Sequence, residues 1–240
     1  MPLPLNSSAH LHDTNAQARY HMIEQQIRPW NVLDEQVLEL LDQVRREDFV
    51  PPEHASLAFM DLEIPLQGTP DEAVDKGWCM LAPRVEARML QDLQLKSTDR
   101  VLEIGAGSGH MAALLAAMAK EVVSLEIEPE LAEMARENLL GAGVENVRVI
   151  QADGADSASV QDVAPEQFDA IVLSGSVAQV PQFLIDKLAD GGRLGAIVGQ
   201  LPVMCFTLLT KNGQQVQTLQ PWDLVAARLA NFDEPSRFNF

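Results

Sequence analysis

The chain has 240 residues and a formal net charge of −18, and 47% of its residues are apolar. That apolar share is typical of a packed globular protein, whereas a surface this acidic repels phosphate backbones and disfavours nucleic acid as a partner. No apolar run approaches the roughly 20 residues that a membrane-spanning helix requires, so we expect no membrane partner.

Residues 1–14 carry no basic region followed by an apolar run, so we expect a loose leader and not a signal peptide. The cysteines, Cys79 and Cys205, lie far apart and match neither a disulfide framework nor metal-ligand spacing. His10 and His12 lie in the leader, and no histidine clusters with cysteines or carboxylates. These features predict a cytoplasmic protein without a metal site.

Residues 15–98 are predicted to form a helical extension followed by a segment on the substrate side. The apolar spacing predicts a first helix over 15–27 and a second helix with Asn31 or Asp34 as its N-cap. Residues 58–68 are expected to be irregular and 68–77 to be polar and turn-prone, and a further helix is predicted over 84–93.

From residue 99 onward, short β-rich runs alternate with helical patterns, which predicts βαβ units on a parallel sheet. The predicted α/β core covers 99–220, and 221–240 is expected to be a C-terminal extension packed on the same domain. A hairpin is predicted around Asn212-Gly213. The strands are expected at 100–104, 121–126, 147–151, 168–173, 193–198, 203–210 and 215–219, and the helices at 110–120, 130–140 and 181–188.

A glycine-rich turn, VLEIGAGSGHMA, joins the first of these strands to the next helix. Glycines at such a junction let the backbone turn sharply and approach a ligand closely. A dinucleotide fingerprint would need its third glycine where this chain has His110, and no lysine follows in P-loop spacing. The turn therefore disfavours a pyrophosphate ligand, and with it a dinucleotide oxidoreductase.

Acidic residues accompany the glycine turn at three successive strand ends: Glu103, Glu126 and Asp153. A carboxylate at the position of Glu126 can accept hydrogen bonds from both ribose hydroxyls. Several acids near an adenosine suit a cationic ligand without phosphates, such as S-adenosylmethionine. The alternative is that Glu103 and Asp153 are loop caps and that the glycines only form a tight turn.

The pattern of Glu103 to Gly109 with Glu126, Asp153 and the later LADGGRL turn resembles the class I S-adenosylmethionine-dependent methyltransferases. Within them, RVLEIGAGSGHMAALLA, EVVSLEIEPELAEMARENL and MIEQQIRPWNVLDEQVLELLDQVRREDFVPP are similar to the protein-L-isoaspartate O-methyltransferase family, over about 19–199. The resemblance implies a doubly wound, Rossmann-like α/β fold with a seven-stranded, mostly parallel sheet and an N-terminal helical extension.

The same resemblance implies S-adenosylmethionine as cofactor, S-adenosylhomocysteine as product, and an isoaspartyl protein or peptide as methyl acceptor. Glu126 is expected to hold the ribose, Gly105 and Gly107 to face the methionine part, and Asp153 to contact the adenine amino group. The full set of implied cofactor-binding residues is Glu103, Gly105, Ala106, Gly107, Gly109, Glu126, Ile127, Asp153 and Gly154.

The chain departs from the family's pattern just before Pro83. The family reads Gln-Thr-Ile-Ser-Gln-Pro there, so its threonine falls at Cys79 and its serine at Leu81. An aliphatic group at Leu81 would reject an unpaired carboxylate. We expect this segment to face the substrate, and the alternative is that it packs under the N-terminal helices. The candidate substrate-side residues are Trp78, Cys79, Met80, Leu81, Ser174 and Ser176, and no residue is assigned as catalytic.

Three functions follow from these observations. The first is a protein-repair carboxyl methyltransferase, as the resemblance implies. The second is a methyltransferase of the same fold acting on a less polar acceptor, including an unidentified small molecule, because the hydroxyls are lost at Cys79 and Leu81. The third is a protein that binds the cofactor without catalysis. The oligomeric state is not readable from the sequence.

Overall fold

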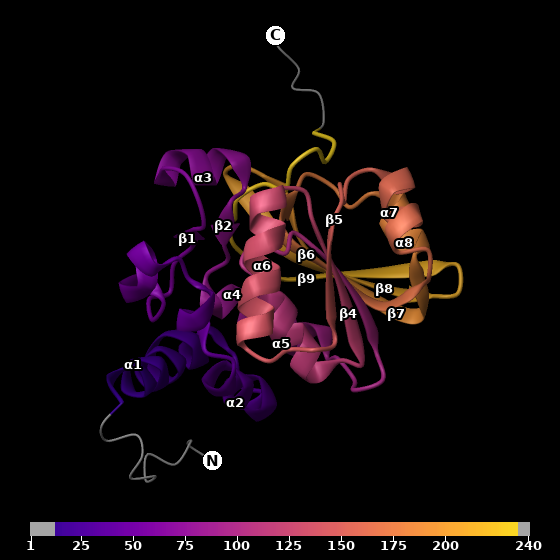
Figure 1. Cartoon of the computed structure of the whole chain (residues 1–240). Helices are drawn as coiled ribbons and strands as arrows, with labels where there is room; N and C mark the ends of the chain where they lie inside the picture. The colour runs from indigo at the N-terminus through magenta and orange to yellow at the C-terminus, as the bar shows by residue number, and fades with distance from the viewer. Residues whose placement is uncertain (1–12, 235–240) are drawn as a thin grey trace.

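The computed structural model describes residues 13–234 (Figure 1). Nearly all of the predicted leader, with His10 and His12, lies outside the described residues. A seven-stranded sheet in the order β5-β4-β3-β6-β7-β8-β9 forms the centre of the molecule. Its strands are β3 (Arg100–Ile104), β4 (Glu121–Glu126), β5 (Val147–Gln151), β6 (Phe168–Val177), β7 (Leu188–Gln200), β8 (Val203–Asn212) and β9 (Gln215–Asp223).

Strands β3 to β7 run parallel, β8 runs antiparallel to β7, and β9 antiparallel to β8. The order reverses at β3, because β4 and β5 lie to one side of it and β6 to β9 to the other. The predicted doubly wound, mostly parallel sheet is therefore confirmed. A crevice forms at such a reversal point, outside the carboxyl ends of the strands, and it is the usual ligand site of these sheets.

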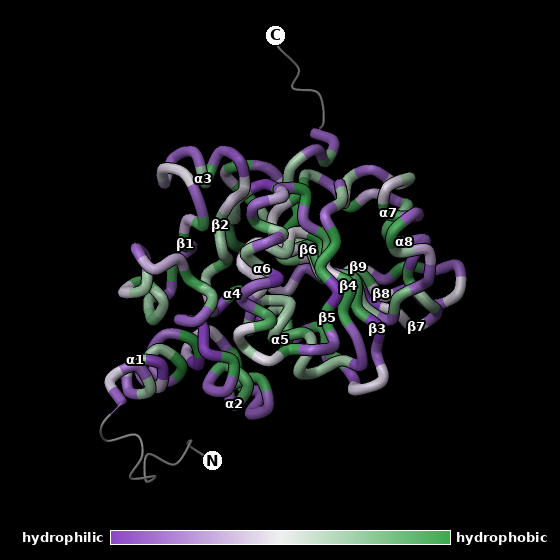
Figure 2. Tube along the Cα trace, viewed as in Figure 1, coloured by the Kyte–Doolittle hydropathy of each residue, from purple (hydrophilic) through white to green (hydrophobic). Residues whose placement is uncertain are grey.

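Helices cover both faces of the sheet (Figure 1). One face packs against α4 (Pro83–Leu93), α5 (His110–Met118) and α6 (Pro129–Gly141), and the other against α7 (Ser157–Val163) and α8 (Gln182–Asp186). Successive residues of β3 therefore serve two cores: Val101 packs toward α4 and α5, and Leu102 packs toward α7 and α8. Figure 2 shows the hydrophobic residues concentrated along these central strands.

The N-terminal extension packs on the face that holds α4 and α5. Asp34, not Asn31, caps α2 by accepting a 2.9 Å hydrogen bond from Gln36 N, whereas Asn31 is in the left-handed region at φ 61°. Asp13 caps α1 through Asn15 N and Ala16 N. The extension comprises α1 (Thr14–Met22), a π-helical turn (Ile23–Ile27), α2 (Glu35–Gln43) and short 3-10 segments at Arg28–Trp30, Arg46–Phe49 and Pro52–Leu57.

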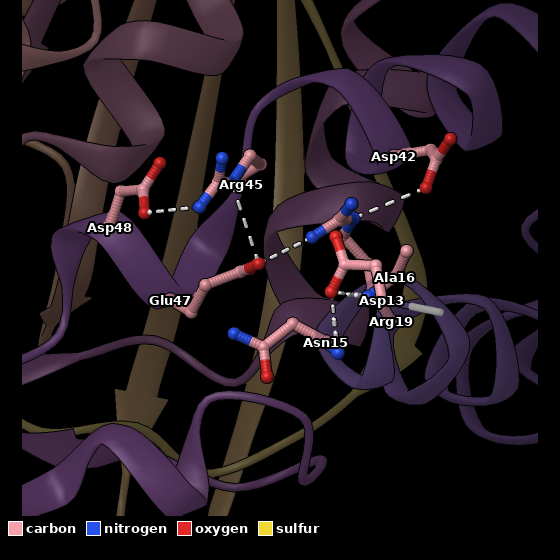
Figure 3. A network of polar contacts seen from close by, with 8 residues as sticks. All are labelled: Asp13, Asn15, Ala16, Arg19, Asp42, Arg45, Glu47 and Asp48. Carbon is pink, nitrogen blue, oxygen red and sulfur yellow. Dashed lines mark hydrogen bonds and ion pairs between the residues drawn. The ribbon is translucent and has the colours of Figure 1, made fainter. Parts of the chain in front are cut away.

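Charged side chains tie α1 to α2 and to the segment after it (Figure 3). The buried Arg19 donates to Asp42 Oδ1 at 3.1 Å and to Glu47 Oε1 at 2.5 Å. Arg45 pairs with Glu47 at 3.6 Å and with Asp48 at 3.1 Å, from a far more exposed position. Arg19 therefore sits at the centre of the network and Arg45 at its rim.

Replacing Arg19 by alanine should lower the free energy of unfolding by about 2 kcal/mol, because two charge-assisted hydrogen bonds are lost and Glu47 is left buried without its main partner. Arg45→Ala is the matched control and should cost less than about 1 kcal/mol, since 54% of its side chain is exposed. Urea unfolding of both variants measures the difference, and equal losses would contradict the central position of Arg19.

The expectations of irregular structure over 58–68 and of a turn-prone stretch over 68–77 missed two short elements. Ile64–Pro65 (β1) pairs with Cys79–Met80 (β2), and α3 occupies Pro70–Lys76. Thr69 and Glu72 form a reciprocal capping box at the start of α3, and Gly77 ends it at φ 75°. The helix is too short to show an apolar period, so its caps were the available signal. The short α7, capped by Asp156, was missed for the same reason.

The chain beyond the sheet forms a C-terminal arm (residues 224–234) that returns over the end of β6. Ala227 O accepts a hydrogen bond from Ser176 N at 2.8 Å, and Leu229 N donates to Ser176 O at 2.9 Å. Figure 1 shows the yellow arm and α3 at one end of the molecule, with α1 and α2 at the other. Within residues 13–234, no helix is both long and apolar enough to cross a bilayer.

Candidate functional site

A pocket of about 520 Å³ opens at the carboxyl ends of β3, β4, β5 and β6, where the strand order reverses. We call it the edge pocket. Residues from four strand ends, the α3–β2 junction and the C-terminal arm line it. They include Lys76, Gly77, Trp78, Cys79, Ile104, Gly105, Gly107, Leu125, Glu126, Ile127, Ala152, Asp153, Gly154, Ser174, Arg228, Leu229, Ala230 and Phe232.

The glycine turn forms one wall of the edge pocket. Gly105 and Gly107 adopt φ values of 92° and 52°, which residues with a Cβ rarely adopt. A Cβ added to Gly105 would lie 2.8 Å from Leu229 Cδ2, so the C-terminal arm packs directly on the turn. Any larger residue at Gly105 would therefore both strain the backbone and displace the arm.

Glu126 ends β4 with its carboxylate at the edge pocket, where only 6% of the residue is exposed. Its Oε2 accepts from Gly107 N at 2.8 Å and its Oε1 from Glu128 N at 3.1 Å. Burial raises the pKa of Glu126, and these backbone donors oppose the shift. Each oxygen retains a further lone pair, so the carboxylate can still accept hydrogen bonds from a vicinal diol.

Asp153 lies beyond β5 on the neighbouring wall. Its Oδ1 accepts from Ala155 N at 2.9 Å, and its Oδ2 accepts from Asn231 Nδ2 at 2.8 Å. The hydrogen bond from Asn231 therefore links the C-terminal arm across the edge pocket to the loop after β5. Gly154 follows, and a Cβ there would come within 2.3 Å of Ile104 Cγ2, so only glycine fits beside β3.

Six predicted site residues do not line the edge pocket, and three of them, Glu103, Gly109 and Ser176, belong to the packing around it. Glu103 is fully buried beneath it and accepts hydrogen bonds from Ser124 Oγ and Ser174 Oγ, at 2.5 and 2.7 Å. Burial raises its pKa to about 8, although these hydroxyls oppose the shift. Gly109 packs against Ala135 of α6 as the N-cap of α5.

Ser176 is the third predicted site residue that belongs to the packing around the edge pocket. It was expected just after the fourth strand, but β6 continues to Val177 with a register shift between Val172 and Ser176. The hydroxyl of Ser176 is fully buried and donates to Ala226 O at 2.9 Å. It therefore anchors the C-terminal arm, and of the two candidate serines only Ser174 reaches the edge pocket.

One half of the segment Trp78–Leu81 faces the edge pocket, and the other half packs under the N-terminal helices. Trp78 and Cys79 line the edge pocket, whereas Met80 and Leu81 are each 4% exposed and pack into the cores beneath the N-terminal extension. A narrower inner pocket of about 250 Å³ continues behind the glycine turn. Its lining includes Cys79, Met80, Leu81, Glu86, Gly105, Ala106, Gly107, Ser108, His110, Met111 and Ser174.

A buried charged cluster beside the inner pocket was not predicted from the sequence. Arg46 Nη1 donates to Glu86 Oε2 at 2.8 Å, and His110 Nδ1 lies 2.9 Å from the same oxygen. Arg46 Nη2 donates to Leu81 O at 2.8 Å, which fixes the backbone of the substrate-side segment. His110 Nε2 is buried with no hydrogen-bond partner among the described residues. No local pattern marks these three residues as a unit.

Cys79 does not have the features of a nucleophile. Burial, and then the charge of Glu63, raise the pKa of its thiol to about 11, so the thiolate is scarce at pH 7. Among residues 13–234, no three histidine, cysteine, aspartate or glutamate side chains gather in a way that could hold a metal ion.

The residues present fit an adenosyl sulfonium ligand. The edge pocket combines a diol acceptor at Glu126, a second acid at Asp153, and apolar walls that include Leu229 and Phe232. Its acids would repel a pyrophosphate but attract a cation. His110 lines the inner pocket, and its buried Nε2 has no hydrogen-bond partner among the described residues.

Comparison with known proteins gives a consistent result. A family model described as protein-L-isoaspartate(D-aspartate) O-methyltransferase matches residues 17–222. A protein-L-isoaspartate O-methyltransferase of Methanoculleus marisnigri is 40% identical over 202 residues, covering 84% of this chain and 86% of its own. Protein-L-isoaspartate O-methyltransferase 2 of Marinobacter nauticus is 38% identical over 196 residues, covering 80% and 84%.

Two solved structures share the fold across most of the chain. One protein-L-isoaspartate O-methyltransferase superposes with a TM-score of 0.73 at 22% identity, covering 89% of this chain and 66% of its own. A Plasmodium falciparum protein described as a β-aspartate methyltransferase (PCMT), in complex with S-adenosyl-L-homocysteine, gives 0.70 at 20% identity and covers 90% and 99%. At these identities the likeness is evidence for the fold alone.

Proposed function

Because this chain belongs to the protein-L-isoaspartate O-methyltransferase family, we propose that it transfers a methyl group from S-adenosylmethionine to the carboxylate of an isoaspartyl residue in a damaged protein. The observation that carries the proposal is the coincidence of two features. The family match spans nearly all of the described chain, and the acidic, glycine-lined pocket lies at the reversal point of the sheet.

The cofactor would be held by residues that line the edge pocket. Glu126 would accept from the ribose hydroxyls, Asp153 would accept from the adenine amino group, and Gly105 and Gly107 would bring the backbone against the methionine part. S-adenosylmethionine supplies an electrophilic methyl group on a sulfonium when bound. Glu103 would act from below, by holding Ser174 at the strand end.

The acceptor needs little chemical activation from the protein. A carboxylate of ordinary pKa, roughly 4, is ionised at pH 7 and is already a nucleophile. The protein must align it and exclude water, which the apolar side chains of Trp78, Leu229 and Phe232 support. No general base is required, in keeping with the raised pKa of Cys79.

A less polar acceptor remains the second candidate, because of the missing hydroxyls at Cys79 and Leu81. The packing of Leu81 weakens this alternative. Leu81 is only 4% exposed and packs mainly in the core, although it also lines the inner pocket. His110 also lines the inner pocket, and its Nδ1 is engaged with Glu86, so the neutral ring offers an acceptor and no donor at Nε2.

The decisive test is methyl transfer from labelled S-adenosylmethionine to an isoaspartyl peptide, with the normal aspartyl peptide as its matched control. We expect methyl transfer to the isoaspartyl peptide to be at least tenfold faster than transfer to the aspartyl peptide. Absence of transfer by protein that binds the cofactor would reject the isoaspartyl acceptor and favour the less polar one. Failure to bind the cofactor would remove both candidates.

Three other expectations from the sequence stay predictions. They are the cytoplasmic location, the absence of nucleic-acid and membrane partners, and the division into an N-terminal extension over 15–98, a core over 99–220 and a C-terminal extension over 221–240. The cofactor-binding protein without catalysis would be identified by cofactor affinity without transfer to any carboxylate.

A further inference from the structure

A second, larger hollow of about 1280 Å³ adjoins the edge pocket on the side of α3. We call it the acidic groove. It runs between α3, the β7–β8 turn and the C-terminal arm. Its lining includes Glu63, Asp75, Leu201, Val225, Arg228 and Glu234.

Negative charge in the acidic groove is not compensated by the protein. Glu63 makes no ion pair within residues 13–234, and its carboxylate accepts only from the backbone of Ala227. Burial raises the pKa of Glu63, which means that the ionised carboxylate is less stable there than in water. Asp75 likewise has no ion pair in the described part of the chain. The cation of the groove, Arg228, is paired with Glu234 at 2.8 Å.

Apolar side chains stand exposed around the same groove. Val74, Leu201 and Val225 are 54%, 71% and 55% exposed, and Met204 is buried at the floor. Clustered exposed apolar residues with a polar rim are typical of an interaction site. The combination is complementary to a segment that carries both positive and apolar side chains.

The acidic groove is continuous with the edge pocket. Arg228 lines both hollows, and Asp75 lies just before Lys76, Gly77 and Trp78, which line the edge pocket. Glu63 lies close enough to Cys79 for its charge to raise the pKa of that thiol, second to burial. A chain bound along the groove would therefore lead toward Cys79 and the edge pocket.

We propose that the acidic groove binds the polypeptide that flanks the methyl acceptor, and that it selects lysine or arginine together with bulky apolar side chains. The proposal rests on the function proposed above and adds the class of flanking sequence. Glu63 and Asp75 supply the attraction for the cation, and Val74, Leu201 and Val225 cover the apolar side chain.

The test compares isoaspartyl peptides of equal length that differ only in two flanking positions, occupied by lysine, glutamine or glutamate beside a constant leucine. We expect kcat/KM for the lysine peptide to exceed that for the glutamate peptide by about tenfold, mainly through KM. The double variant Glu63→Gln, Asp75→Asn should reduce this ratio to about twofold. Cofactor affinity should not change.

The matched control is Glu53→Gln, which removes a charge from an exposed residue outside the groove and should leave the tenfold ratio intact. Equal kcat/KM for the three peptides would overturn the proposal, as would a ratio that survives in the double variant. If no peptide is methylated, the proposed function fails instead. Fluorescence anisotropy of the same labelled peptides still tests the groove, since binding needs no transfer, and equal affinities would overturn it.

Discussion

Replacing Glu126 by alanine is expected to weaken the binding of S-adenosylmethionine and S-adenosylhomocysteine by at least about a hundredfold. Each hydrogen bond from a ribose hydroxyl to this carboxylate is worth roughly 1.5–3 kcal/mol, because one partner is charged. The substitution also removes the acceptor for Gly107 N and Glu128 N, so the glycine turn loses its anchor to β4. Isothermal titration calorimetry with either ligand measures the loss directly.

Glu133→Ala is the appropriate control, since it removes the same charge from an exposed position on α6. It should leave both affinities within about twofold. An unchanged affinity in Glu126→Ala would mean that the adenosyl site lies elsewhere. If Glu126→Ala lowered the melting temperature by the same amount with and without saturating ligand, Glu126 would contribute to folding alone.

Replacing Glu86 by alanine is expected to lower the free energy of unfolding by about 3–5 kcal/mol. The guanidinium of Arg46 is 2% exposed and would be left buried without its carboxylate, and His110 Nδ1 would lose its partner. For a domain of this size, that loss corresponds to a fall in Tm of roughly 6–20 °C. Thermal and denaturant unfolding both report it.

A double-mutant cycle separates the charge from the packing in this cluster. Arg46→Met with Glu86→Leu removes both charges and keeps the volume, so it should recover most of the stability that either single change loses. The hydrogen bond from Arg46 to Leu81 O is lost in the cycle as well, which sets an upper limit on the recovery. Additive losses would show that the cluster contributes through packing and not through paired charges.

The parts of the fold that were predictable from the sequence are those set by local patterns. The bounds of β3, β4 and β5 agree with expectation because each strand is short, rich in apolar residues and bounded by turn signals. The acids at Glu126 and Asp153 follow from strand ends, so placing the strands also placed these residues at the edge pocket. Whether they bind the cofactor as expected stays a prediction.

The parts that were missed depend on contacts between distant residues. Leu229 meets Gly105 only because the C-terminal arm folds back over β6, and nothing in the sequence around Leu229 indicates this. Arg46, Glu86 and His110 come from three separate elements, and each is ordinary in its own surroundings. Glu103 was placed at the right strand end but facing the wrong way, since its side chain is buried with Ser124.

The position of Leu229 and Phe232 in the pocket wall has a consequence for biosynthesis. These residues follow every strand of the sheet in the chain, so β3, β4 and β5 can pair before Leu229 and Phe232 have been synthesised. A chain that ended before Leu224 would keep every strand of the sheet and lack one wall of the pocket. The nascent protein therefore completes this pocket only after residue 232 has emerged from the ribosome, well after the strands that form the other walls.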